Sequence, residues 1–528
     1  GADPGTIVYP LNETVFPLGV LAPEVQINNV QDGVYRLKIQ EKYLEYIAYF
    51  NATAPVRHLL DQTAWESIGA SGRGSKSDPV KVEVSRLQNG QAYAPMTQTW
   101  HIAQGRVRGI VYYWELPGAC MGAANEGKIL KIRPDSATPE EFYKPGVCWG
   151  CHTVSRDGTT MMANVEKALP VPQITLDLTQ NPVTVGSIDV AKGLAGTFGA
   201  FNDSGNKLLV SNDFLVDDNA GKILRIVDAA NGTVLNANAM GAGCIEPAWS
   251  PDGKKLSAIC GATTVNPGDS WGFDSPTGNL MVADVGTDGF SVTNVKQIVA
   301  QTGGQGRPAY PSFTSDSAYI AFGRPTDGSR SRQNGDIWLV KPDGTAPKKL
   351  TTISSDNKSF NPVFAPQRAG GYYWLVFISR RDYGNTLVGT DRQQLWMAAI
   401  DDPPRLPILR IRRFTCVGKK VVARAKTRIW RPSLATIKVI RARRVSIAAR
   451  GNASKTRQTP ECTFVASRPR QECVRNSGIA ANWPLIVVPL RRYASTAIAN
   501  FPSRRELNRQ RREKRYERRA NHVIRRSP

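Results

Sequence analysis

The repeat that organises this chain is clearest in Ala248-Trp-Ser-Pro-Asp-Gly-Lys-Lys-Leu256, where an apolar pair, a tight polar turn and a second apolar run follow one another. The Asp-Gly at its tip supplies the positive φ that a short hairpin turn needs. The pattern returns four more times, so we expect five hairpins of one kind. The other four are Thr153-Val-Ser-Arg-Asp-Gly-Thr-Thr-Met161, Ala200-Phe-Asn-Asp-Ser-Gly-Asn-Lys-Leu208, Ser312-Phe-Thr-Ser-Asp-Ser-Ala-Tyr-Ile320 and the looser Pro362-Val-Phe-Ala-Pro-Gln367.

The spacing of these hairpins predicts a propeller. A period of about 50 residues, with further strands between the hairpins, is what four-stranded propeller blades require. A β-sandwich with similar turns is the alternative. The turns fall at Asp157, Ser204, Asp252, Asp316 and Gln367, which are 47, 48, 64 and 51 residues apart.

The segments also resemble a known family, the TolB-like propeller repeat. The match is closest at Gly335-Asp-Ile-Trp-Leu-Val-Lys-Pro-Asp-Gly344 and the following Lys348-Lys-Leu-Thr351. The resemblance covers about residues 150–400 and implies a β-propeller. It implies little about activity, because propellers host many functions.

The residues that precede the repeats also have the pattern of β-strands. Residues 1–135 lack the repeat but contain β-branched or aromatic runs at 35–39, 80–85 and 107–114. We therefore predict an all-β protein with an N-terminal β-sandwich and a propeller of about five or six blades. The predicted divisions are an immunoglobulin- or fibronectin-like sandwich over 1–135, a linker over 136–152, the TolB-like propeller over 153–404 and an Arg-rich tail over 405–528.

Composition excludes several classes of protein. The hydrophobic fraction is 41% and the charged fraction 21%, which is ordinary for a globular chain and excludes wholesale disorder. No apolar run approaches the roughly 18 residues that span a bilayer, so we expect a soluble chain without a transmembrane segment. The chain starts at Gly1 without a basic, apolar signal region, so we expect any export signal to have been removed, and a lipid anchor on that removed segment stays open.

The net charge of +24 is confined to the tail. Residues 405–528 hold 33 of the 68 Lys and Arg residues and 5 of the 44 acidic residues, a balance of +28, with no Asp and three Gly. One interpretation is a basic arm for nucleic acid or an anionic surface. The other, which the loss of Asp and Gly favours, is an unstructured or out-of-frame extension. We expect no specific nucleic-acid partner.

Cys148-Trp-Gly-Cys151-His152 carries the chemistry. Cys-x-x-Cys-His is the signature of covalent c-type haem attachment. Two cysteines three apart can each form a thioether with one vinyl group of the porphyrin, and the adjacent histidine then supplies the axial imidazole. We predict one covalent haem c held by Cys148, Cys151 and His152. A zinc site or a disulfide is the alternative, although zinc needs about four ligands and a disulfide across two residues is strained.

Two residues are candidates for the sixth iron position. Met161 lies on the return strand of the first hairpin, but it also aligns with the core residues Leu208 and Leu256. His101 follows a strand-like run in the first domain, where a lone histidine is more often an ordinary hydrogen-bonded residue. We rank the two equally.

Two further cysteines fit an exported protein. Cys244 and Cys260 lie eight residues before and eight after Asp252, so paired antiparallel strands would bring them within disulfide range. Attached haem and a disulfide both predict the periplasmic or extracellular side of a bacterial envelope.

Three functions fit these features. The first is electron transfer by an exported mono-haem cytochrome, with a redox partner protein. The second is an envelope scaffold that binds protein or polysaccharide through the propeller, with haem structural or absent. The third is peroxidase-like haem catalysis, which requires an open sixth position. Whether the chain is an enzyme is left open, with electron carrier or scaffold favoured.

Overall fold

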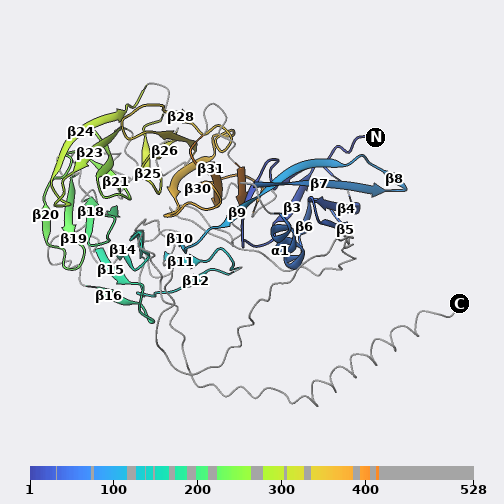
Figure 1. The fold of residues 1–528 in the computed structure, drawn as a ribbon, viewed down its shortest axis with the longest axis horizontal. Coiled ribbons are helices and arrows are strands. Elements are labelled where there is room, and N and C mark those ends of the chain that lie inside the picture. Colours follow the sequence, from blue (N-terminus) through green and yellow to red (C-terminus); the bar gives the residue numbers. More distant parts are fainter. Residues whose placement is uncertain are drawn as a thin grey trace, which may run out of the picture. The chain divides into compact units, whose positions relative to one another are not determined.

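The computed structural model is almost entirely β (Figure 1). The described part lies within residues 1–448, and residues 449–528 lie outside it. The structure describes residues 1–30, 32–72, 77–115, 127–136, 138–146, 149–165, 173–186, 198–211, 223–262, 277–302, 306–325, 334–384, 393–404 and 412–415. No helix in these ranges is long and apolar enough to cross a membrane.

Two sheets form the N-terminal sandwich. The larger has the strand order β2-β9-β7-β4-β5, with β8 paired to β7, and the smaller has the order β1-β3-β6. Alternate residues such as Leu37 and Val82 are fully buried between them. This period-two pattern is typical of a sheet with one buried face and one solvent-exposed face. The strands are β1 (Thr6–Tyr9), β2 (Val15–Leu18), β3 (Glu24–Asn28), β4 (Gly33–Gln40), β5 (Glu45–Ala52), β6 (Val56–Leu59), β7 (Ser77–Gln88), β8 (Gln91–Ala92) and β9 (Met96–Arg106).

One helix, α1 (Gln62–Ser71), covers part of this sandwich. The Asp61 carboxylate accepts a hydrogen bond from the Ala64 amide at 2.8 Å, which caps the helix N-terminus. Trp65 is buried on the helix face that meets the sandwich, with its ring edge-on to Phe16 at 4.9 Å. The helix is therefore held by apolar packing and one cap.

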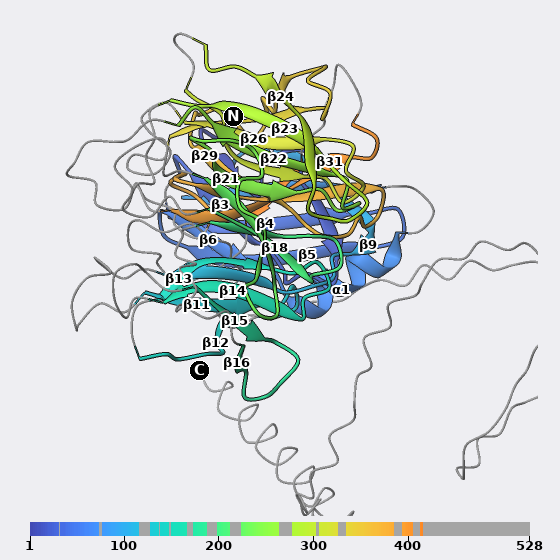
Figure 2. The same ribbon diagram turned by 90° about the vertical axis from the view of Figure 1, so that its left-hand side faces the viewer.

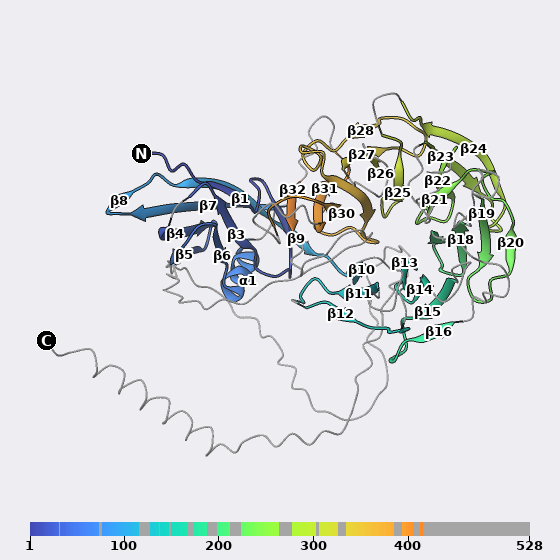
Figure 3. The same ribbon diagram turned by 180° about the vertical axis from the view of Figure 1, so that it is seen from behind.

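Five four-stranded sheets follow, each with its strands in chain order. This up-and-down order within each sheet is that of propeller blades, and Figure 3 shows the ring from behind, with β32 beside β31. The blades are β13 (Trp149–Val154), β14 (Thr160–Val165), β15 (Gln173–Asp177), β16 (Thr184–Gly186); β17 (Gly199–Phe201), β18 (Lys207–Ser211), β19 (Leu224–Asp228), β20 (Val234–Asn236); β21 (Ile245–Trp249), β22 (Lys255–Cys260), β23 (Asn279–Val285), β24 (Val292–Val299); β25 (Ala309–Phe313), β26 (Ile320–Pro325), β27 (Gly335–Val340), β28 (Lys348–Lys349); β29 (Ser359–Phe364), β30 (Tyr372–Ser379), β31 (Gln394–Asp401) and β32 (Arg412–Thr415).

A sixth, three-stranded sheet completes the ring. It contains β10 (Val111–Glu115), β11 (Lys128–Ile132) and β12 (Glu140–Glu141). One face contributes Tyr113 to the core shared with the last blade and the sandwich, and the other contributes Trp114 to the core shared with the first blade. Figure 2 shows β11 beside β13 of the first blade. Each pair of neighbouring four-stranded blades also shares a core. The ring therefore closes through the three-stranded sheet and the sandwich.

The all-β class and the propeller are as predicted, but the structure divides the chain differently in two places. The predicted sandwich over 1–135 includes β10 and β11, and the predicted linker over 136–152 includes β12 and the start of β13. A strand pattern does not show which sheet a strand joins. Here β10 and β11 contribute buried residues from both of their faces, so they lie between two other sheets. In the tail predicted to be unstructured, residues 412–415 form β32; residues 405–411 and 416–528 lie outside the described residues.

The predicted hairpin turns have the expected chemistry. Asp157, Asp252 and Asp316 each accept a hydrogen bond from the hydroxyl two residues earlier, at 2.6, 2.6 and 2.8 Å. Gly158 and Gly253 have φ of 77° and 74°, the left-handed conformation that these turns require. The local turn sequence therefore sets the first hairpin of each blade.

Candidate functional site

The described part of the Cys-x-x-Cys-His motif lies on β13, the first strand of the first blade. Gly150 pairs with Asn164 and Thr153 pairs with Met162, so Cys151 and His152 together oppose one residue of β14. This is a β-bulge, and Cys151 has the left-handed φ of 46°. Cys151 and His152 are both half-buried, whereas Cys148 lies outside the described residues.

The same bulge occurs in the first strands of three other blades. In β21, β25 and β29 the strand register also shifts, and a left-handed residue stands at the shift. His152 occupies the position of a proline in all three. The backbone of the motif is therefore a recurrent property of the blades. The equivalent residues are Glu246 (φ 52°) before Pro247, Tyr310 (φ 52°) before Pro311 and Asn361 (φ 50°) before Pro362.

Aromatic side chains surround the motif. Trp149 is 2% exposed, and its ring lies edge-on to Phe142 at 5.6 Å and to Tyr143 at 5.2 Å. Tyr112 lies edge-on to Phe142 at 5.2 Å, and burial raises the pKa of Tyr112 to about 12. Cys151 packs against the same apolar core. This environment favours an apolar group over a strongly solvated one.

Trp114 on β10 lies directly against the motif. A Cβ placed on Gly150 would be 2.4 Å from Cε2 and 2.7 Å from both Cδ2 and Nε1 of Trp114. Because ordinary carbon contacts are about 3.5–4.0 Å, only glycine fits at position 150. The sequence did not single out Trp114, because nothing local to a tryptophan 34 positions before the first cysteine signals this contact.

The two candidates for the sixth iron position lie in different environments. Met161 is fully buried in the core that also contacts Trp149 and Cys151, where it pairs with Val154. His101 is on β9 in the sandwich, with its Nε2 3.0 Å from a carboxylate oxygen of Glu13. The structure thus brings Met161 and Cys151 to one core and gives His101 a carboxylate partner elsewhere.

Contacts across the middle of the ring link blades that are not neighbours. The ring of Phe198, next to β17, lies 6.1 Å from that of Tyr310 on β25. At the hairpin-turn end, Arg156 Nη2 donates to the Ser315 carbonyl at 3.0 Å. The first strands of the blades therefore approach one another across the ring.

A buried ion pair joins the third and fourth blades beside the recurrent bulge. Arg307 Nη2 and Glu246 Oε1 are 2.9 Å apart, and both side chains are 1% exposed. The second carboxylate oxygen accepts the Tyr310 amide at 2.8 Å. Sequence reasoning missed this pair because its members are 61 positions apart and lie outside the turn motif.

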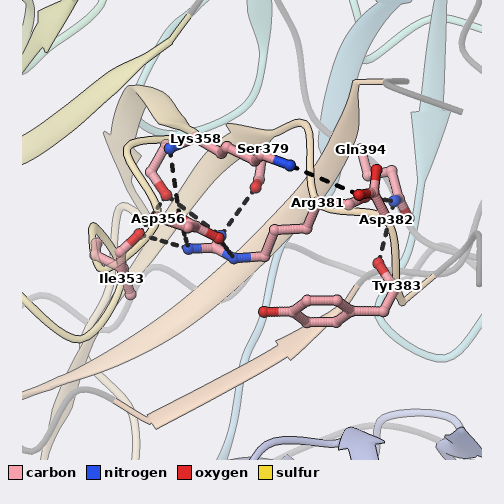
Figure 4. Close-up of polar contacts among 9 residues, drawn as sticks. Ile353, Asp356, Lys358, Ser379, Arg381, Asp382, Tyr383 and Gln394 are labelled. Atoms are coloured by element: carbon pink, nitrogen blue, oxygen red, sulfur yellow. Dashed lines mark hydrogen bonds and ion pairs between the residues drawn. The ribbon is translucent and has the colours of Figure 1, made fainter. Parts of the chain in front are cut away.

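Figure 4 shows a second buried arginine, Arg381, between β30 and β31. It donates to Asp356 Oδ1 at 2.7 Å, to the Ile353 carbonyl at 2.9 Å and to Ser379 at 2.9 Å. Three residues further on, the Gly384 amide donates to Gln26 Oε1 at 2.8 Å, and Gln26 Nε2 donates to the Gly384 carbonyl. These bonds attach the last blade to the sandwich, which makes the cluster structural.

The structure joins Cys244 and Cys260 by a disulfide, the pairing that the sequence predicted. The adjacent Ile245 and Ile259 are directly paired across β21 and β22. This register brings the two Cα atoms to 4.0 Å.

The comparisons with known proteins concern the fold. No family model matches the chain, and no curated protein matches it. Among solved structures, TolB from Acinetobacter baumannii is similar over 70% of this chain and 84% of its own, with 15% identity and a TM-score of 0.41. A TolB protein from Agrobacterium tumefaciens is similar over 60% and 92%, with 16% identity and a TM-score of 0.35. A chain of the nidogen/laminin complex is similar over 58% and 97%, with 11% identity and a TM-score of 0.34.

Across the described ranges, which do not include Cys148, no three His, Cys, Asp or Glu side chains gather as metal ligands. A half-exposed cysteine and histidine in a preformed bulge suit a group attached from one side, with aromatic rings beneath it. The buried Nε1 of Trp114 also has no hydrogen-bond partner among the described residues, which leaves a donor next to the motif.

Proposed function

We propose that this protein is an exported mono-haem c-type cytochrome built on a propeller, with electron transfer as its function. Cys148 and Cys151 would hold the porphyrin through thioethers, and His152 would be the axial ligand of the iron. The observation that carries the proposal is the Cys-x-x-Cys-His motif at the start of the first blade. Its described residues, Cys151 and His152, are half-exposed on a bulge that three other blades share.

The residues of this chain would mainly exclude water and orient the motif. Trp149, Phe142 and Tyr143 form an apolar floor, which disfavours the more highly charged state of a bound group. Bound haem would supply one-electron chemistry at its iron. A redox partner protein in the envelope would exchange the electron, and the Cys244–Cys260 disulfide supports a location outside the cytoplasm.

The chain offers its own fold-neutral control for a test of haem attachment. The double variant Cys151→Asn, His152→Pro reproduces the Asn361-Pro362 pair of the last blade, so it should keep the bulge. Produced in a periplasm that attaches haem, the natural chain should keep its red colour after acid–acetone extraction and gain the mass of one haem. The double variant should gain none, and it should melt at the same temperature as the natural chain made without haem attachment. A natural chain without attached haem, or a haem-loaded double variant, would refute the proposal.

The sixth iron position separates electron transfer from peroxidase-like catalysis. If Met161 or His101 closes it, the ferrous protein should be low-spin and should not bind carbon monoxide. Loss of the low-spin spectrum in Met161→Ala but not in His101→Ala would identify the ligand. Rapid carbon monoxide binding by the natural chain would instead favour catalysis at an open position.

A further inference from the structure

The indole nitrogen of Trp114 is unusual among the tryptophans of this structure. Trp114 is 8% exposed, yet its Nε1 is buried and has no hydrogen-bond partner among the described residues. Trp396 shares this property, but its ring lies under the Arg381 guanidinium at 5.1 Å. Four other tryptophans donate to an oxygen. These are Trp65 to Val20 at 3.2 Å, Trp100 to Gln98 at 2.9 Å, Trp249 to Gly253 at 3.2 Å and Trp374 to Ala369 at 3.0 Å.

The position of this donor is as informative as its lack of a partner. Nε1 is one of the three Trp114 atoms within 2.7 Å of the Cβ position of Gly150, so the N–H lies beside the residue between the two cysteines of the motif. A buried tryptophan N–H normally donates to an acceptor. A missing hydrogen bond at such a donor lowers the folding equilibrium constant by about tenfold. A donor is therefore held in place at the attachment motif.

We propose that the Trp114 N–H donates a hydrogen bond to an acceptor oxygen of the group attached at Cys148 and Cys151. The inference rests on the proposed haem, whose carboxylate side chains supply such oxygens. Trp114 then has two tasks: its ring packs on Gly150 and positions the motif, and its nitrogen binds the cofactor. Positioning needs the aromatic ring, whereas binding needs the N–H, so a phenylalanine at this position separates the two.

The test compares Trp114→Phe in the haem-loaded chain and in the same full-length chain made without haem attachment. Without haem, the smaller ring should lower the urea midpoint through lost packing alone, because the indole N–H has no partner to lose. With haem attached, the same substitution should lower the midpoint by more, because a hydrogen bond is also lost, and it should shift the reduction potential. The control is Trp65→Phe, which removes the bond to Val20 in the sandwich and should lower the midpoint equally in both forms.

The outcomes distinguish this inference from the proposed function. If haem is attached but Trp114→Phe lowers the midpoint of both forms alike and leaves the reduction potential unchanged, the inference is wrong. A natural chain that never acquires haem would overturn the proposed function and this inference together.

Discussion

Replacing Gly150 with alanine tests the closest packing contact at the motif. The added Cβ would lie 2.4, 2.7 and 2.7 Å from three atoms of the Trp114 ring, so the ring or β13 must move by about 1 Å to restore ordinary contacts. Trp114 is 8% exposed in a filled core, and overpacking of this kind costs about 1–3 kcal/mol. We therefore expect Gly150→Ala to lower the free energy of unfolding of the haem-free chain by that amount in urea denaturation.

Gly323→Ala is the matched control, because a methyl group added to this buried-strand glycine would meet no atom closer than 3.6 Å. It should leave the free energy of unfolding unchanged or raise it by up to about 1 kcal/mol. Trp114→Ala should relieve the overlap, so Gly150→Ala should cost less in that background, and the double-mutant cycle measures the coupling. The two residues do not compete for space if the Gly150→Ala chain is as stable as the natural one. The same conclusion follows if the stability losses of Gly150→Ala and Trp114→Ala add up to that of the double variant.

Three further predictions follow from buried charges and from the ring. Burial lowers the pKa of His58 from 6.5 to about 4, so between these pH values the unfolded chain binds a proton that the folded chain does not. The free energy of unfolding should therefore fall by about 2–3 kcal/mol from pH 6.5 to pH 4. His58→Phe should reduce this pH dependence in urea titrations. Glu246→Gln leaves Arg307 buried without its anion and should cost about 3–5 kcal/mol of unfolding free energy; a loss below about 1 kcal/mol would contradict this. Deleting residues 416–528 should leave the melting temperature unchanged, because the cores of the described ring come from residues before 404; salt-dependent DNA binding that vanishes on deletion would instead reveal a basic arm.

The blade hairpins were predictable because their signals are local. A hydroxyl or amide, an acidic residue and a glycine within five positions satisfy a turn wherever it occurs, and alternating apolar residues then set two paired strands. The symmetric spacing of Cys244 and Cys260 about such a turn also predicted their disulfide, since paired strands keep a constant register. The same regularity places His152 at the position that a proline occupies in three other blades, as the strand registers show.

Contacts between distant segments were decided only by the tertiary structure. The sequence by itself determined the strands, the turns and the Cys-x-x-Cys-His motif, all of which depend on neighbouring residues. It did not determine that β10–β12 joins the ring, that Trp114 packs on Gly150 or that Glu246 pairs with Arg307. Each of these contacts depends on how whole sheets stack, and apolar burial is non-directional, so a strand pattern shows that a face is covered without showing which sheet covers it.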